Sequence, residues 1–291
     1  MSHPLTFGVV LEPQHWSWAE NVEQWKIAEE LGFESIWLND HFYSLTGPDN
    51  NDAFEASTTF AALALMTTKP KIGVLTYGNS HRIPTILAKE VVTIDHMSGG
   101  GRVILGIGAG WNEPEHAAYS IPFPSAGERV ARLEEALEIF KLLETNDRTN
   151  YQGKYYTLVD TPFVPKPVQG RIPILIGGKR PKMLRLIGKH ADIWDCGLEP
   201  DELKAAYVIV RQHAAEAGRD PDEITASTPV WREQMPDNVF ADRVRAFYDA
   251  GVRQMLIQHP WDRAGIETIN GLMERVVPEL RAELERYGSD S

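Results

Sequence analysis

Short apolar runs alternate with longer amphipathic stretches along almost the whole chain. Apolar runs of about four to eight residues bounded by turn residues are typical of strands buried on both faces. The positions that we predict as strands are 5–11, 34–38, 71–75, 102–107, 173–176, 192–195, 224–228 and 254–258. Between them, apolar residues recur with the helical period. We predict helices at 20–31, 55–66, 84–97, 128–144, 181–190, 201–217, 241–250 and 266–287, the last open to interruption at Pro278.

This alternation of strands and helices indicates a parallel sheet, because parallel neighbours need a crossover connection that is usually a helix. Eight such units within 291 residues predict an α/β protein built as a closed (β/α)8 barrel. A doubly wound open sheet is the alternative. No linker or shift in composition divides residues 1–291, so we expect a single domain.

Residues 145–171 break the rhythm and are predicted to form an insertion before the fifth strand. Residues 151–155 have the composition of a hairpin turn, and Pro162, Pro165 and Pro167 then favour an extended path. Long ordered loops are usually functional. We therefore expect this insertion to lie over one end of the barrel.

Composition and charge narrow the range of partners. With 43% hydrophobic and 24% charged residues, the chain is typical of soluble globular proteins. Its net charge of -12 disfavours nucleic acid and anionic membranes as partners. We find neither a secretory signal nor an apolar run long enough to span a bilayer. The one cysteine, Cys196, excludes an internal disulfide and suits the cytoplasm, where we expect the protein.

Side chains just beyond the strands are the candidate functional residues, because barrels of this kind place their active sites at the C-terminal ends of their strands. They are Glu12, Gln14, His15, Trp16, Asn39, Asp40, His41, Phe42, Thr76, Tyr77, Asn79, Gly108, Gly110, Trp111, Asn112, Gly177, Gly178, Lys179, Trp194, Cys196 and Gly197. This set is rich in aromatic, amide and hydroxyl groups, which favours a flat heteroaromatic ligand. The chain lacks the motifs of serine hydrolases, zinc proteases and P-loop enzymes, and no spacing demands a metal, so we expect none.

Asp40 and His41 form the most informative pair. Neighbouring residues at a strand end point to different sides, so one can face a pocket while the other braces it. An imidazole that titrates near neutrality can move a proton. The alternative is that Asp40 caps the turn and His41 is a buried hydrogen-bonding group.

Two glycine-rich turns indicate close approach of a ligand to the backbone. Gly106, Gly108 and Gly110 follow one another at every second position, although a tight turn alone explains them equally well. Gly177 and Gly178 lie between a strand and a helix, and Lys179 adds positive charge. The free N–H groups and dipole at such a helix start favour a phosphate, and a plain connection is the alternative.

The tryptophans divide into two groups. Trp25 and Trp37 lie within a helix stripe and a strand, so we expect them in the core. Trp16, Trp111 and Trp194 lie near strand ends and are candidates for the pocket wall.

Several of these segments together resemble the luciferase-like monooxygenase superfamily over nearly the whole chain. The segments are 35–42 (SIWLNDHF), 87–89 (LAK), 93–100 (TIDHMSGG), 106–111 (GIGAGW), 155–156 (YY), 165–169 (PKPVQ) and 173–178 (PILIGG). The pattern Trp37-x-x-Asp40-His41-Phe42 is most similar to the branch that depends on the deazaflavin coenzyme F420. The resemblance implies a (β/α)8 barrel that binds F420 and transfers a hydride, and it implies a homodimer. An FMN-dependent monooxygenase and a non-enzymatic flavin-binding barrel are the alternatives.

The resemblance also implies roles for individual residues. It places Asp40, His41 and Trp111 at the catalytic centre, with His41 handling a proton. It assigns contacts with the coenzyme to Asp40, Gly73, Val74, Thr76, Gly108, Ala109, Asn112, Gly177, Gly178, Lys179 and Trp194. It further implies a cis peptide bond between Gly73 and Val74, beneath the ring.

One departure from the pattern concerns the substrate. The glucose-6-phosphate dehydrogenases of the F420-dependent branch carry a catalytic glutamate after the glycine loop, and Trp111 stands in that place here. We therefore expect a flatter or more apolar substrate than glucose 6-phosphate.

Overall fold

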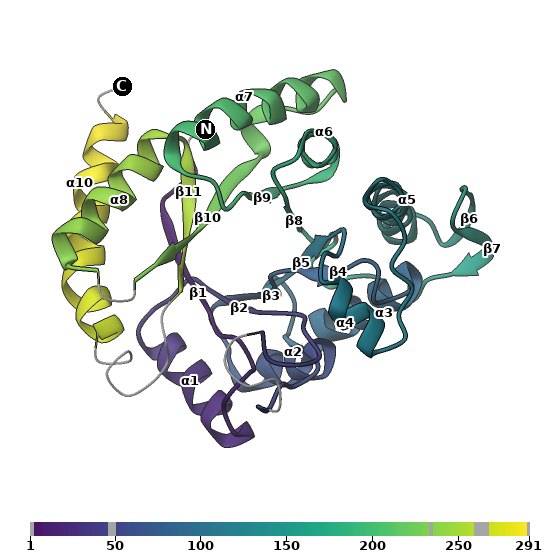
Figure 1. The fold of residues 1–291 in the computed structure, drawn as a ribbon, viewed down its shortest axis with the longest axis horizontal. Coiled ribbons are helices and arrows are strands. Elements are labelled where there is room, and N and C mark those ends of the chain that lie inside the picture. Colours follow the sequence, from purple (N-terminus) through teal and green to yellow (C-terminus); the bar gives the residue numbers. More distant parts are fainter. Residues whose placement is uncertain (1–2, 46–50, 233–234, 259–267, 290–291) are drawn as a thin grey trace.

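The computed structural model describes residues 3–45, 51–232, 235–258 and 268–289. Eight parallel strands close into a barrel, so the predicted barrel is confirmed and the open sheet is wrong (Figure 1). In their order around the barrel the strands are β1 (Thr6–Val10), β2 (Ser35–Leu38), β3 (Lys71–Val74), β5 (Val103–Gly108), β8 (Ile174–Gly177), β9 (Ile193–Asp195), β10 (Thr225–Trp231) and β11 (Val252–Gln258). The short strand β4 (Tyr77–Gly78) continues the line of β3 alongside β5.

Helices surround the barrel, as Figure 1 shows. They are α1 (Trp18–Glu30), α2 (Ala56–Met66), α3 (Pro84–Met97), α4 (Glu113–Ala118), α5 (Ala126–Thr145), α6 (Pro181–His190), α7 (Pro200–Glu216), α8 (Asp237–Asp249) and α10 (Val277–Ser289). The sequence prediction did not include α4. None of the described helices combines the length and apolar character needed to cross a bilayer.

The last predicted helix begins at Ile266, which lies outside the described residues. Residues 268–271 are helical, and a π-helical turn (Leu272–Val276) follows. Helix α10 then runs through Pro278. The interruption expected at this proline therefore falls just before it, where Pro278 cannot supply a backbone N–H to the preceding turn.

Two apolar layers hold the barrel together. Alternate residues of the strands point inward, and Val10, Trp37, Ile104, Leu175 and Leu256 fill the interior. The remaining strand residues face the helices and form the larger core, as Phe7 and Val9 do in β1. This filled interior forms a rigid floor beneath the carboxyl ends of the strands.

The segment 145–171 contains the predicted hairpin, formed by β6 (Arg148–Gln152) and β7 (Thr157–Pro162). Glu135 of α5 accepts hydrogen bonds from the backbone N–H groups of Lys154 and Tyr156. Farther along, the backbone N–H of Val168 donates to Asp95 of α3. The prediction placed this segment over one end of the barrel, whereas these contacts place it against the outer helices α3 and α5.

Candidate active site

A cavity of about 540 Å³ opens at the carboxyl ends of the barrel strands. This volume lies in the range of small-molecule sites, which is about 300–1,000 Å³. The cavity is lined by Asp40, His41, Leu75, Thr76, Gly78, His81, Gly108, Ala109, Gly110, Trp111, Asn112, Glu115, Gly177, Gly178, Lys179, Arg180 and Met183. Of the residues to which the resemblance gives a catalytic or coenzyme role, all line this cavity except Gly73, Val74 and Trp194. The strand-end candidates that do not line it are Glu12, Gln14, His15, Trp16, Asn39, Phe42, Tyr77, Asn79, Trp194, Cys196 and Gly197.

Gly73 and Val74 lie below this cavity and do not line it. A side chain on Gly73 would collide with the ring of Trp37, so this glycine makes room for the tryptophan that fills the barrel. Val74 is buried between the barrel and its helices. The non-proline cis peptide bond joins Leu75 to Thr76, so the predicted position between Gly73 and Val74 is wrong.

Trp194 is fully buried, so its prediction as a pocket wall is also wrong. Its indole Nε1–H donates to the carbonyl oxygen of Gly178 at 2.8 Å. The tryptophan therefore supports the Gly177–Gly178 turn from below. Trp194 is the central residue of β9, and alternation along this strand points its side chain toward the helices.

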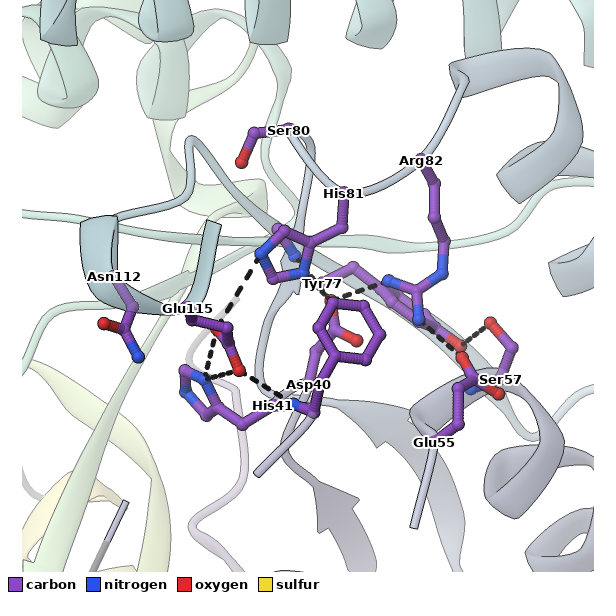
Figure 2. Close-up of polar contacts among 12 residues, drawn as sticks. Asp40, His41, Glu55, Ser57, Tyr77, Ser80, His81, Arg82, Asn112 and Glu115 are labelled. Atoms are coloured by element: carbon purple, nitrogen blue, oxygen red, sulfur yellow. Dashed lines mark hydrogen bonds and ion pairs between the residues drawn. The ribbon is translucent and has the colours of Figure 1, made fainter. Parts of the chain in front are cut away.

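Asp40 is the centre of a buried polar cluster beside the cavity (Figure 2). Its Oδ2 accepts hydrogen bonds from the Gly78 backbone N–H at 2.9 Å and from Arg82 Nη1 at 2.7 Å, and His81 Nδ1 lies at 3.1 Å. Burial alone would raise the pKa of Asp40, but the hydrogen bond from His81 and the charge of Arg82 lower this pKa to about 2. Asp40 is therefore ionised at neutral pH.

The guanidinium of Arg82 joins Asp40 to a second carboxylate. Its Nη2 donates to Glu55 Oε1 at 2.6 Å. Burial opposes the charge of Arg82, but Asp40 and Glu55 raise the pKa of the guanidinium above its usual value. Glu55 also accepts from the backbone N–H groups of Ser57 and Thr58 and thereby caps α2. A helix end and a strand end are thus tied together beside the cavity.

His41 forms a second contact with a buried carboxylate. Its Nδ1 lies 3.0 Å from Oε2 of Glu115, and the Phe42 backbone N–H donates to Oε1 of the same glutamate at 2.7 Å. Figure 2 shows the carboxylate of Glu115 between the rings of His41 and His81. Burial would raise the pKa of Glu115, but the hydrogen bonds from His41 and Phe42 lower it below its usual value.

Trp111 lies at the edge of the cavity with 67% of its surface exposed. Its ring meets that of His41 edge to face, with 5.8 Å between ring centroids. An exposed indole is free to cover a flat ligand, because a bound ligand would remove its apolar surface from water.

The opposite wall of the cavity is formed by the turn between β8 and α6. Lys179 and Arg180 are exposed there and line the cavity. Among the described residues, neither takes part in an ion pair. Gly178 has a φ of 151°, and a side chain on it would approach Met183 within 2.9 Å, so only glycine fits. The wall therefore combines uncompensated positive charge with the N-terminus of α6.

Two further carboxyl groups lie near the barrel mouth. Burial raises the pKa of Asp195 to about 7, and no described residue forms a hydrogen bond with its buried Oδ1. Burial also raises the pKa of Glu12, although the charges of His41 and His15 oppose this effect. The site therefore contains carboxyl groups with widely different proton affinities.

A family model described as luciferase-like monooxygenase matches residues 5–270. This chain belongs to that family. Among curated luciferase-like relatives, an F420-dependent glucose-6-phosphate dehydrogenase of Microbacterium testaceum is 30% identical over 243 residues. The alignment covers 82% of this chain and 71% of the relative.

Two solved structures share the fold of this chain. An F420-dependent secondary alcohol dehydrogenase in complex with an F420–acetone adduct superposes with a TM-score of 0.84 at 20% identity, covering 95% of this chain and 99% of the other. The long-chain alkane monooxygenase LadA gives 0.80 at 14% identity, covering 97% and 92%. At these identities the likeness describes the fold alone.

The sequence prediction missed the side chains that contact Asp40 and His41, which are His81, Arg82 and Glu115. His81 and Arg82 follow Asn79 by two and three positions in an irregular loop, and Glu115 follows Asn112 on the short helix α4. The signal in the sequence is spacing, because all three residues lie within three positions of Asn79 or Asn112, which are themselves candidates at strand ends.

Proposed function

We propose that this chain is an F420-dependent oxidoreductase, which transfers a hydride between the deazaflavin and a small organic substrate. The observation that carries the proposal is one cavity with two unlike walls. One wall holds buried acid–base groups, and the other presents cations at a helix N-terminus that make no ion pair with the described residues. The F420-dependent enzymes among the relatives support the choice of coenzyme.

The Gly177–Arg180 wall fits a phosphorylated coenzyme. Its backbone N–H groups and the N-terminus of α6 favour an anion, and Lys179 and Arg180 supply charge that no other described side chain neutralises. Thr76, Gly108 and Ala109 are small and leave room for a flat ring between this wall and His41. Asp40 lines the same space, and its buried Oδ1 has no hydrogen-bond partner among the described residues.

When bound, F420 supplies the carbon centre that accepts or donates a hydride. The residues of the chain bind the coenzyme and the substrate, orient them, and move the proton. His41 lines the cavity, and with Nδ1 held by Glu115 its Nε2 is the ring nitrogen left for a ligand. An alcohol that loses its carbon-bound hydride also loses its hydroxyl proton, and His41 Nε2 is placed to accept it. Trp111 would cover the substrate and exclude water.

The substrate that we propose is flat or apolar and is not glucose 6-phosphate. Trp111 offers an apolar surface at the cavity edge, where the sugar-phosphate dehydrogenases are expected to carry a glutamate. Glu115 does not replace that glutamate, because its carboxylate is already engaged by His41 and Phe42.

The coenzyme is tested by titrating the purified protein with F420 and with FMN and following fluorescence quenching. We expect tight F420 binding, and reduction of F420 by a member of a panel of secondary alcohols but not by glucose 6-phosphate. Tight FMN binding without F420 affinity would favour a monooxygenase. A non-enzymatic carrier would be favoured if F420 bound without any turnover and if His41→Asn left the affinity for F420 unchanged.

A homodimer is part of the proposal, and apolar side chains exposed on neighbouring helices support it. On α2 and α3 these are Leu65, Met66, Ile86 and Met97. Exposed apolar surface of this kind marks protein–protein contacts. Sedimentation equilibrium should give a dimer for the native chain and a larger monomer fraction for Ile86→Glu.

A further inference from the structure

Glu115 is the carboxylate that the chemistry proposed above does not use. Its side chain is fully buried, with 0% of its surface exposed, although it lies at the edge of an open cavity. The lowered pKa of this glutamate means that it is ionised at neutral pH. A buried carboxylate is costly unless its oxygen atoms are hydrogen-bonded, so its partners indicate why it is there.

The two oxygen atoms of Glu115 have different partners. Oε1 accepts from the backbone N–H of Phe42 at 2.7 Å. Oε2 lies 3.0 Å from Nδ1 of His41 and 3.9 Å from Nε2 of His81. Since an ionised carboxylate only accepts hydrogen bonds, the Nδ1 of His41 must carry a hydrogen. In neutral His41, the lone pair then resides on Nε2.

We propose that Glu115 is a positioning residue for His41, fixing both the orientation of its ring and the position of its proton. The inference rests on the proposed function, in which His41 Nε2 accepts a proton from the substrate. A base oriented by a third group is the usual arrangement where a histidine moves protons. Here helix α4 delivers the third group from a position 74 residues away in the sequence.

A second contact from α4 shows that Glu115 is not needed merely to hold this helix against the loop after β2. Tyr119, at the end of α4, donates its hydroxyl to the carbonyl oxygen of Phe42 at 2.8 Å, and the two rings pack at 4.9 Å. The loop after β2 is therefore attached to α4 even without the contact between Glu115 and His41. The carboxylate adds a charge and an acceptor aimed at the imidazole.

Other charged groups also face this pair. His81 lies on the loop before α3, and Glu12 from the loop after β1 interacts electrostatically with His41. Among the described residues, neither His81 nor Glu12 makes a hydrogen bond to His41, whereas Glu115 contacts its Nδ1 directly. We therefore infer that Glu115 is the group that keeps the proton on Nδ1 of His41.

Glu115→Gln tests the assignment with almost no change in shape. The amide oxygen must stay on the Phe42 N–H, because two donors cannot face each other. The amide NH₂ group then faces His41, whose Nδ1 must become the acceptor, and the proton moves to Nε2. Glu113→Gln is the matched control, because Glu113 lies on the same helix but is exposed.

Nitrogen-15 NMR of protein labelled only at histidine measures this change in tautomer without coenzyme or substrate. The His41 signals are assigned as those that disappear in His41→Asn. We expect the Nδ1–H tautomer in the native chain and in Glu113→Gln, and the Nε2–H tautomer in Glu115→Gln. Glu115→Asp, which keeps the charge, should keep the native tautomer. An unchanged tautomer in a folded Glu115→Gln variant would overturn the proposal, whatever the coenzyme proves to be.

Turnover of F420 with an alcohol substrate supplies the second readout. We expect Glu115→Gln to lower kcat by about 100-fold with little change in KM, since a mispositioned general base loses a contribution of about 10²- to 10⁴-fold. In a His41→Asn background the same substitution should cost less than about twofold, because residues that act as one unit are non-additive. An equal loss in both backgrounds would make Glu115 a structural residue.

Discussion

The two walls of the cavity differ in how their charged side chains are paired. On the Asp40 wall, the buried carboxylate of Asp40 pairs with Arg82, which also pairs with the half-buried Glu55. On the Gly177–Arg180 wall, Lys179 and Arg180 are exposed and, among the described residues, make no ion pair. One wall is complete before any ligand arrives, whereas the other has charge still to be neutralised.

The difference indicates which part of the ligand each wall receives. A preformed network costs no reorganisation during a reaction, so it suits the reacting atoms. Unpaired cations at a helix N-terminus suit an anion that arrives from water. Stability should therefore depend on the Asp40 wall, and affinity for an anionic coenzyme should depend on the other.

The largest effect is expected for Asp40→Asn. Removing one charge of a buried pair leaves Arg82 poorly compensated, which typically costs about 3–5 kcal/mol. Urea denaturation measures this loss directly. Asp242→Asn is the control, because its ion pair with Arg245 lies at the surface and should be worth less than about 1 kcal/mol. Equal losses in the two variants would remove the distinction between a buried network and ordinary surface pairs.

His41→Asn should lower turnover by about 100-fold, the lower end of the range for general acid–base groups. This is about 2.7 kcal/mol of transition-state stabilisation. Steady-state kinetics with F420 and an active alcohol measures it. Turnover within about threefold of the native value would show that His41 does not transfer a proton in the reaction.

Acid should weaken the Asp40 wall selectively. The pKa of Asp40 is lowered from its ordinary value of 3.8 to about 2. Its ionised form therefore stabilises the folded chain above pH 3.8, and this contribution is lost as the pH falls toward 2. The difference in unfolding free energy between the native chain and Asp40→Asn should shrink by about 2 kcal/mol over this interval. A difference independent of pH would contradict the assigned ionisation.

The smallest effect is expected on the exposed wall. Lys179→Ala should weaken F420 binding by about fivefold, or about 1 kcal/mol, and make the affinity less sensitive to salt. Lys204→Ala, an exposed lysine on α7, is the control. Fluorescence titrations at low and high sodium chloride give both quantities. Identical salt dependence in the two variants would mean that the phosphate does not meet this wall.

The fold was predictable because its signal is periodic. Helices α3 and α6 begin and end where their prolines and apolar stripes predict. Helix α4 was missed because it is only 6 residues long and offers no repeated stripe. Its contact from Glu115 to His41 joins residues 74 positions apart, and no local pattern encodes such a pairing.

The errors at the site have a similar cause. Trp194 lies near a strand end, but only the closed barrel shows that it supports Gly178 from below and leaves the cavity wall to the turn itself. Gly73 looked like a place for a ligand, yet the ring that approaches it is Trp37 of the neighbouring strand. A glycine in the sequence indicates that another group approaches the backbone closely, but it does not indicate whether that group is a ligand or a side chain of the protein.

A crystal structure with F420 bound tests the central claim most directly. We expect the coenzyme phosphate at the Gly178 and Lys179 N–H groups, and the ring beside Thr76 and Gly108 with one face toward His41. A coenzyme bound elsewhere, or a phosphate held away from the start of α6, would contradict the account.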